Sequence, residues 1–546
     1  MGQILDVILV AYSFFFLSLF ITDYSFVNPT ISINNIIAPT IGLGLLFLLR
    51  WLARGKSLKN SIIIAFYLRF RHIKDKNLVA LLFVLTFLLF SIISIARHFS
   101  LCSGGWDLGI FDQAVWNVTK GNSLFCSIKY PQGGNLLGDH FEPILFFIAP
   151  LYLLWPNVLV LIILQSFLLA SAIIPLYLIA KSILKDRFVI FAFLVCYILS
   201  KPLRGIVFSD FHPEAFIVPA LFWGYYFLIK RKNVFLWLSI IVLLLCKEDA
   251  TFLVLGFGLF ALIIPKRRLI GLSFVAVSIF LWWLETGIII PYFSPTHHFQ
   301  YLSKMPFGVT YLDNVKFCFL HPLLFIKFIF SKYKISYILR LFAPLCFLSL
   351  LSPPQYILVF FPLFKNLLES PGSTLYCTFH FHYAAGVLPF VFISAIYGCH
   401  ALLKKLRMSK SNVIVGLFLI GFSLLFFGET DGYRFAGFLN NMKVNHAFEK
   451  IRSLHLIPPE ASVLATGDIC AHLSHRKYIY DLSNTEGKTI FPEYIVIDRG
   501  VFGNEYLTSK QNSTIDNYLS VAQRKGYKII SNVQNRSFMI LTNTQS

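Results

Sequence analysis

Long apolar runs separated by short polar segments recur along most of the chain. The first two runs cover about Ile4–Ile21 and Ile36–Leu52, the third covers Leu78–Ala96, and the last covers Val413–Phe427. A helix needs about 20 apolar residues to cross the hydrocarbon core of a bilayer. The pattern therefore predicts an all-α polytopic membrane protein with about 13 transmembrane helices.

From about Gly428 the apolar runs give way to shorter segments with other periodicities. Helical spacing is present at Asn445–Leu456 and Tyr518–Lys525. Short apolar or alternating segments predict strands at Ser462–Thr466, Tyr478–Asp481, Tyr494–Asp498, Tyr527–Ser531 and Ser537–Thr542. We therefore expect a small C-terminal α/β domain, residues 431–546, outside the membrane.

The composition supports the membrane interpretation. Of the 546 residues, 57% are hydrophobic and 13% are charged, and the mean hydropathy is +0.71. A soluble protein of this size does not need so much apolar surface. The formal charge of +21 would suggest nucleic acid in a soluble chain, but the basic residues cluster in short loops between apolar runs. Such clusters set orientation in a bilayer, and the chain has no nucleic-acid-binding motif, so we exclude nucleic acid as a partner.

Basic clusters also give the predicted orientation. The strongest lies between Arg54 and Lys76, after the first two apolar runs, and cytoplasmic loops carry an excess of Lys and Arg. This places the N-terminus in the cytoplasm and the loop 97–142 outside. Three regions follow: residues 1–76 with two additional spans and a basic cytoplasmic loop, residues 77–430 as the membrane core, and residues 431–546 as the extracytoplasmic domain.

Nine cysteines are scattered through the chain without a C-x-x-C motif. Cys102 and Cys126 fall in one predicted external loop, where an oxidising compartment would permit a disulfide between them. Isolated thiols account for the same pattern, and the sequence leaves both alternatives open.

The loop 97–142 carries more charge than a simple connector between two spans requires. Asp107 and Asp112 lie five residues apart around Gly109. If residues 108–116 form a short helix, both acids lie near its N-terminus, where carboxylates interact favourably with the helix dipole. That structural role and a functional role explain the pair equally well when it is considered alone.

Two motifs at the external ends of spans favour a functional role. His140-Phe141-Glu142-Pro143 and His212-Pro213-Glu214 each place an imidazole and a carboxylate two residues apart beside a proline. In an extended segment such residues share a face. One such motif would be an interfacial anchor, but two beside paired aspartates favour a cation site or an acid–base centre. The candidate cation ligands are Asp107, Asp112, His140, Glu142, His212 and Glu214.

Lys247-Glu248-Asp249 interrupts two apolar runs, Val234–Cys246 and Ala250–Ile264, each shorter than a span. Two short helices that meet at three charges would hold these charges below the external surface, inside the protein. Ionisable groups at such depth are costly and usually functional. The alternative is a self-neutralising ion pair that closes a turn.

Lys201 and Arg204 are cations on the predicted external side, against the orientation bias. Arg and Lys bind phosphate oxygens well, so a lipid phosphate is a suitable partner. The alternative is a salt bridge to a nearby acid such as Asp210.

These motifs resemble those of a known family. The stretches that carry the resemblance are Trp106–Gln113, His140–Pro143, Phe211–Glu214, Lys247–Asp249 and His382-Tyr383. They are similar to a family of prokaryotic predicted membrane proteins that is grouped with the GT-C glycosyltransferases. The resemblance covers roughly residues 77–430, with a weaker echo in the C-terminal segment.

The resemblance implies a GT-C fold, a helical membrane body with an acid-bearing first external loop. Such enzymes take a sugar from a polyprenyl-phosphate carrier on the extracytoplasmic side and pass it to a lipid, a glycan or a protein. Their catalytic aspartate lies early in that loop, which matches Asp107 or Asp112, and we favour Asp107 as the general base. Some relatives use a divalent cation and others do not, so the need for a metal stays open.

The other candidate residues receive supporting roles in this hypothesis. Lys201, Arg204 and Lys247 would attract the donor phosphate. Residues expected to orient the base or hold a cation are His140, Glu142, His212, Glu214, Glu248, Asp249 and His382. The expected location is the prokaryotic cytoplasmic membrane, and the expected partners are a polyprenyl-phosphate-linked sugar, its acceptor and membrane lipids.

Two other function classes fit a polytopic chain with internal charges. A lipid-linked sugar transporter or flippase would use these charges as a path, and a non-catalytic receptor or assembly protein would use them to bind an ion structurally. Transporters often show inverted repeats and sites at the midplane. Here we find no repeat, and the charged motifs fall on one predicted face, which favours the enzyme.

Overall fold

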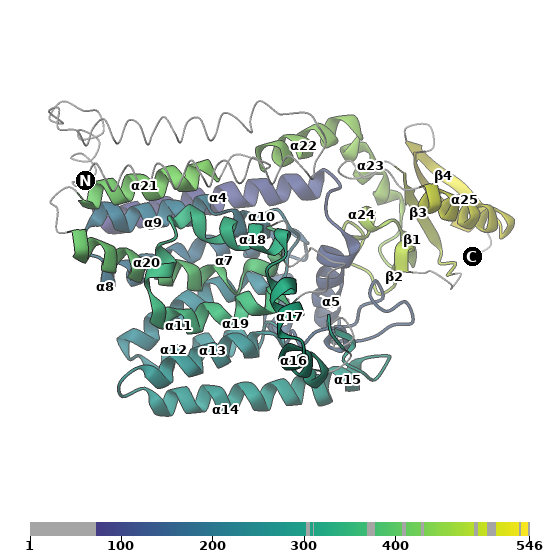
Figure 1. Cartoon of the computed structure of the whole chain (residues 1–546). Coiled ribbons are helices and arrows are strands. Elements are labelled where there is room, and N and C mark those ends of the chain that lie inside the picture. The colour runs from purple at the N-terminus through teal and green to yellow at the C-terminus, as the bar shows by residue number, and fades with distance from the viewer. Residues whose placement is uncertain are drawn as a thin grey trace.

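The computed structural model describes residues 73–301, 306–308, 311–368, 377–379, 381–406, 411–426, 431–484, 490–499, 509–533 and 537–543. The two predicted N-terminal spans and almost all of the basic loop that follows them lie outside these residues. The described part forms a helical body with a small β-sheet at one end (Figure 1).

Three described helical segments are long and apolar enough to cross a bilayer. They are α4 (Asp75–Phe99), α7 (Leu159–Ser171) continued by α8 (Ile173–Ile183), and α14 (Arg268–Leu284) continued to Phe293. A fourth segment qualifies if α9 (Arg187–Leu199) and α10 (Lys201–Val207), which are bent by 44°, form one span. The figure of about 13 transmembrane helices therefore stays a prediction.

Shorter helices complete the body and the connection to the sheet. They are α5 (Ile110–Thr119), α6 (Ile144–Leu154), α11 (Ile217–Lys230), α12 (Asn233–Leu244), α13 (Ala250–Ile263), α15 (Ile290–Phe293), α16 (Tyr311–Leu320), α17 (Pro322–Ile329), α18 (Lys332–Phe342), α19 (Tyr356–Leu367), α20 (Leu388–Leu406), α21 (Ser411–Leu425), α22 (Asp431–Val444) and α23 (Ala447–Ser453). The break between α12 and α13 falls at Lys247-Glu248-Asp249, as the two short apolar runs predict.

Helix α4 shows why the body belongs in lipid. Its apolar side chains Leu81, Leu88 and Ile92 are about half exposed, whereas its polar residues Ser91 and Ser94 are buried. The Ser94 hydroxyl donates to the carbonyl of Val207 at 3.1 Å. Small polar residues that face other helices while large apolar residues face outward are typical of membrane helices. The chain is therefore a membrane protein.

The C-terminal segment contains one five-stranded sheet in the order β2-β1-β3-β5-β4. The strands are β1 (Val463–Ala465), β2 (Ile479–Asp481), β3 (Tyr494–Asp498), β4 (Tyr527–Val533) and β5 (Phe538–Asn543). Strand β1 pairs in parallel with both β2 and β3, and β5 pairs antiparallel with β3 and β4. Helices α24 (Gly467–Cys470) and α25 (Ser509–Arg524) accompany the sheet. The predicted strands and the α/β character are confirmed.

The sheet and the loop 97–142 share one hydrophobic core. Leu108 and Ile110 of the loop belong to the same buried cluster as Ile469 and Ile479 of the C-terminal segment. Figure 1 shows α5 beside α24, β1 and β2 at one end of the helical body. The loop and the C-terminal segment therefore lie on the same side of the body, as the predicted orientation requires.

All nine cysteines are free in the structure. Cys102 and Cys126 are both buried and belong to different hydrophobic clusters. Of the two alternatives that the sequence left open, the structure shows the isolated thiols.

Candidate active site

The loop forms a short π-helical turn, Gly105–Gly109, directly before α5. Asp107 lies in this turn, and Asp112 lies in the first turn of α5. The predicted helix over residues 108–116 is thus present, slightly displaced towards the C-terminus. Both acids lie near its N-terminus, yet their side chains have entirely different partners.

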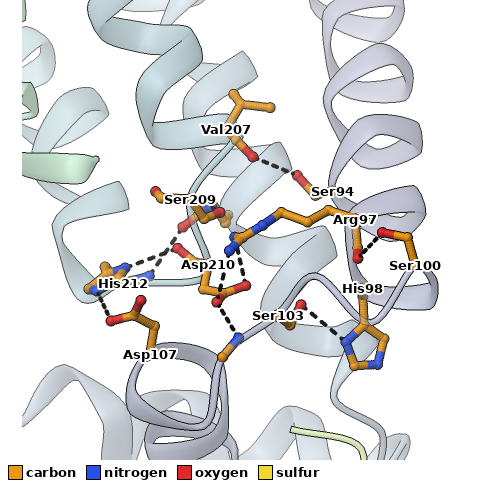
Figure 2. A network of polar contacts seen from close by, with 12 residues as sticks. Ser94, Arg97, His98, Ser100, Ser103, Asp107, Val207, Ser209, Asp210 and His212 are labelled. Carbon is orange, nitrogen blue, oxygen red and sulfur yellow. Dashed lines mark hydrogen bonds and ion pairs between the residues drawn. The ribbon is translucent and has the colours of Figure 1, made fainter. Parts of the chain in front are cut away.

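The start of the turn is held by a buried ion pair. Arg97, at the end of α4, forms two bonds to the Asp210 carboxylate at 2.7 and 3.2 Å, and the Gly104 backbone N–H donates to the same carboxylate at 2.8 Å (Figure 2). Charge-assisted, bidentate contacts of this kind fix geometry strongly. Sequence reasoning did not assign Arg97 or Asp210 to the site. The signal available was a further cation at an external span end, against the orientation bias.

Asp107 contacts His212 at 3.3 Å between Oδ1 and Nε2. The Asp107 side chain is 43% exposed, whereas that of His212 is 8% exposed. Burial raises the pKa of Asp107, but the hydrogen bond and charge of His212 outweigh it and lower the pKa to about 2. Conversely, burial lowers the pKa of His212, and Asp107 outweighs this effect and raises it. Asp107 is therefore an ionised, accessible carboxylate whose partner, His212, is buried.

Behind His212 the network continues into the helical body. The His212 and His382 rings stack with 3.6 Å between centroids, and His382 Nε2 lies 3.4 Å from Glu214 Oε1. Burial and the charge of His212 hold the pKa of His382 well below its usual range. Two stacked imidazoles repel each other when both are charged, so a proton on this pair is favoured on His212 over His382.

Lys247 closes this network. Its Nζ donates to Glu214 Oε1 at 2.7 Å, and both side chains are buried. The mutual attraction outweighs the effect of burial, so the pKa of Glu214 lies well below and that of Lys247 well above the usual range. Asp107, His212, His382, Glu214 and Lys247 thus form one continuous polar network, although they come from four separate segments of the sequence.

The other two charges of the Lys247–Asp249 triplet have their own partners. Glu248 accepts from the His140 ring at 2.7 Å and from the Phe141 backbone N–H at 3.0 Å. Asp249 pairs with Lys365 of α19. Lys247 and Glu248 are buried and Asp249 is partly buried. The triplet does not neutralise itself, because each charge reaches a different segment.

Asp112 lies apart from this network. Its fully buried carboxylate accepts from the hydroxyls of Tyr152 and Ser474 and lies 3.1 Å from His475 Nε2. Ser474 and His475 belong to the C-terminal segment, so Asp112 links the loop to that segment. Ser474 and His475 were not among the candidates derived from the sequence. Nothing local to Ser474 indicates a partner 362 residues away.

The six candidate cation ligands do not gather into one site. Asp107 and His212 form one pair, His140 bonds to Glu248, and Asp112 bonds to the C-terminal segment. Within the described ranges no group of three or more His, Cys, Asp or Glu side chains is arranged to hold a metal ion. These residues therefore do not fit a shared metal site, and we derive no chemical step through a metal.

Lys201 and Arg204 lie on α10, Lys201 partly exposed at its start and Arg204 buried. The acid considered as their alternative partner, Asp210, is bound by Arg97. The charge of Lys247, the third predicted phosphate-binding cation, is directed at Glu214.

The sequence of residues 97–537 matches a family described as "Predicted membrane protein (DUF2079)". The chain belongs to this family. The family match begins at Arg97, so the third apolar run, Leu78–Ala96, precedes it together with the two leading runs. The match also includes the C-terminal segment, for which the motifs had shown only a weak echo. Among curated proteins, none is significantly similar in sequence.

The fold of this DUF2079 member is similar to that of ArnT from Cupriavidus metallidurans, whose crystal structure was determined with bound undecaprenyl phosphate. The two share 11% sequence identity and a TM-score of 0.50, over 87% of this chain and 99% of ArnT. At this identity the likeness shows the fold alone. It supports the GT-C grouping that the motifs imply.

Proposed function

We propose that this protein is a membrane glycosyltransferase that moves a sugar from a polyprenyl-phosphate donor to an extracytoplasmic acceptor, with Asp107 as the general base. The fold shared with ArnT, which binds undecaprenyl phosphate, supports the lipid-phosphate donor. The acceptor class, a lipid, a glycan or a protein, is left open by the proposal.

The proposal rests on one observation: the ionised, accessible carboxylate of Asp107 lies at the exposed end of a buried polar network. Asp107 is 43% exposed, while the side chains of His212, Glu214 and Lys247 behind it are at most 10% exposed. Burying ionisable groups inside a membrane protein costs free energy, and groups buried in this way are usually functional. Among the described residues, Glu214 Oε2 and His382 Nδ1 are also buried without hydrogen-bond partners, which suits a site that binds a polar ligand.

The chemistry follows from the positions of these groups. The acceptor hydroxyl oxygen forms a bond to the anomeric carbon of the sugar, while the bond from that carbon to the phosphate oxygen breaks. The polyprenyl phosphate leaves with the electron pair, and the Asp107 carboxylate accepts the hydroxyl proton as the new bond forms. The His212 ring holds the carboxylate in place before transfer.

The departing phosphate requires positive charge close to it. We assign Lys201 and Arg204 of α10 to this task, because Lys201 is partly exposed and α10 begins the segment that leads to Asp210 and His212. Lys247 instead acts as the buried counter-ion of Glu214. Four further candidates are assigned to holding the buried part of the network in place rather than to contacting the donor: His140, Glu142, Glu248 and Asp249.

The test is sugar transfer by the purified full chain in lipid vesicles, from a labelled polyprenyl-phosphate sugar. Asp107→Asn keeps the volume and removes the charge, and it should lower the transfer rate by ~10²–10⁴, the usual effect of losing a positioned base. Donor binding should stay near the wild-type level. Glu449→Gln, which removes an exposed carboxylate paired with His446, is the control and should transfer normally.

A transfer rate unchanged by Asp107→Asn would refute the assignment of the base. Movement of the labelled lipid across the vesicle membrane without any transfer would refute the enzyme and favour a flippase.

We also propose that the loop 97–142 and the C-terminal segment face the extracytoplasmic side of a prokaryotic cytoplasmic membrane, with the N-terminus in the cytoplasm. Because the loop and the segment share a core, one measurement places both. Protease added to cells whose outer layer has been removed should cleave between residues 428 and 445. Cleavage only after lysis would reverse the orientation.

A further inference from the structure

The parallel strands of the C-terminal sheet point their carboxyl ends at the turn that carries Asp107. Strand β1 lies between β2 and β3 and pairs in parallel with both, so the carboxyl ends of the three strands lie at one edge of the sheet. In open α/β sheets ligands bind outside the carboxyl ends of the strands. Here the place is taken by Gly105 of the loop, which approaches Gly467 after β1 and Asp481 at the end of β2.

The approach is so close that it requires glycine. A Cβ atom on Gly105 would lie 2.8 Å from Asp481 Oδ2, 2.8 Å from Cys470 Cβ and 3.3 Å from the Gly467 carbonyl oxygen. A Cβ atom on Gly467 would lie 3.0 Å from the same Asp481 oxygen. The backbone of the π turn therefore packs directly against the edge of the sheet.

Polar contacts hold the turn in this position against the sheet. Asp481 is buried, and its Oδ1 accepts from the backbone N–H of Ser483 at 2.8 Å and from the Ser483 hydroxyl at 2.6 Å. The Ser483 hydroxyl in turn accepts from Trp106 Nε1 at 2.9 Å. Trp106 and Asp107 are adjacent in the turn, so an anchored Trp106 fixes the backbone from which the Asp107 carboxylate extends.

We propose that Asp481 and Ser483 are positioning residues of the active site, and that the C-terminal sheet holds the Gly105–Trp106 backbone so that Asp107 meets His212. The inference rests on the proposed function for its kinetic readout. It assigns the C-terminal segment a direct part in the geometry of catalysis. A misplacement of about 1 Å can cost up to ~10²-fold in rate, which sets the size of the expected effects.

The first test compares three glycine-to-alanine changes in the full chain. Gly105→Ala should lower kcat by about 10²-fold and leave donor binding near wild type. Gly467→Ala, whose new Cβ meets only the end of the Asp481 side chain within 3.4 Å, should lower kcat by about 10-fold. Gly437→Ala in α22, where nothing lies within 4 Å of the new Cβ, is the control. A kcat for Gly105→Ala equal to that of the control would overturn the proposal.

A second measurement does not depend on sugar transfer. Hydrogen exchange of the backbone amides of residues 105–110 should accelerate in Gly105→Ala and stay unchanged in Gly437→Ala. Only the former change separates the turn from the edge of the sheet. If the wild-type protein transfers no sugar while this difference is present, the proposed function fails but the packing of the turn against the sheet is supported. Equal exchange in the two variants refutes this packing even if the enzyme is active.

A double-mutant cycle tests the anchor itself. Trp106→Phe and Ser483→Ala each remove the hydrogen bond between these residues and should each lower kcat by about 3- to 10-fold. The double variant should be no slower than the slower single variant, because the same interaction is removed. Fully additive losses would show that the two residues act independently and would refute the anchor.

Discussion

Asp107 and Asp112 are two aspartates of one turn-and-helix unit, and each faces a histidine. Asp107 is half exposed and paired with His212 of the membrane body, whereas Asp112 is fully buried and bonded to His475 of the C-terminal segment. Five residues correspond to about 1.4 turns of an α-helix, and their separate partners show that the two carboxylates do not share a face. In the proposed function, the same residue type thus serves as the reactive group at position 107 and as a connection to the C-terminal segment at position 112.

The surroundings decide between these roles. Behind Asp107 lies a network of ionisable groups that ends at Lys247, and the Asp107 carboxylate itself is open to solvent. The Asp112 carboxylate is fully buried and bonded to the hydroxyls of Tyr152 and Ser474 and to the His475 ring, so it is closed to an incoming hydroxyl.

The largest stability effect should come from the network behind Asp107. Lys247→Met leaves Glu214 and its acidic neighbours buried without their counter-ion, and such a loss costs about 3–5 kcal/mol. The double variant with Glu214→Gln should recover much of this loss. Chemical unfolding of the purified full chain measures both, with Lys181→Met, which removes an exposed ion pair to Asp75, as the control near zero. A double variant as unstable as the single one would contradict the pairing.

Asp112→Asn should have a smaller effect, and on a different quantity. The hydroxyls of Tyr152 and Ser474 bond to different oxygens of the carboxylate, so the amide keeps one acceptor and places its N–H₂ group against the other hydroxyl. This should lower the free energy of unfolding by about 1–3 kcal/mol. The transfer rate of the folded protein should change by less than about 10-fold, compared with ~10²–10⁴ for Asp107→Asn. If Asp112→Asn is inactive and Asp107→Asn is not, the roles of the two acids are reversed.

The smallest effect concerns the pH dependence of the Asp112 connection. Burial lowers the pKa of His475, but the charge and hydrogen bond of Asp112 outweigh it and raise the pKa above the usual 6.5. The stabilisation by the charged pair is therefore fully present below pH 6.5 and is lost as the pH rises through the pKa of the folded protein. We expect about 0.5 kcal/mol, the size of a partly exposed ion pair.

His475→Gln should remove this slope above pH 6.5, whereas His446→Gln, which affects an exposed histidine, should not. Unfolding at a series of pH values from 5 to 9 provides the measurement. A wild-type stability that is flat over this range would show that the pair contributes nothing as an ion pair.

The sequence by itself determined the kind of protein and the residue types of its site. Apolar runs give helices in lipid, period-two segments give the C-terminal strands, and two short runs meeting at Lys247 place its charge inside the body, since each of these signals is local. The grouping of His212, Glu214 and Lys247 was also predictable, because all lie at span ends on one predicted face.

Only the tertiary structure decided which groups meet. Arg97 reaches Asp210 across 113 residues, and Asp112 reaches Ser474 across 362. No periodicity encodes such pairs, since they depend on how segments approach after packing. The same holds for Gly105, whose lack of a side chain has a visible reason only when the edge of the C-terminal sheet lies against it. Local patterns fix helices and strands, whereas the partner of a buried charge is fixed by the shape into which all of them pack.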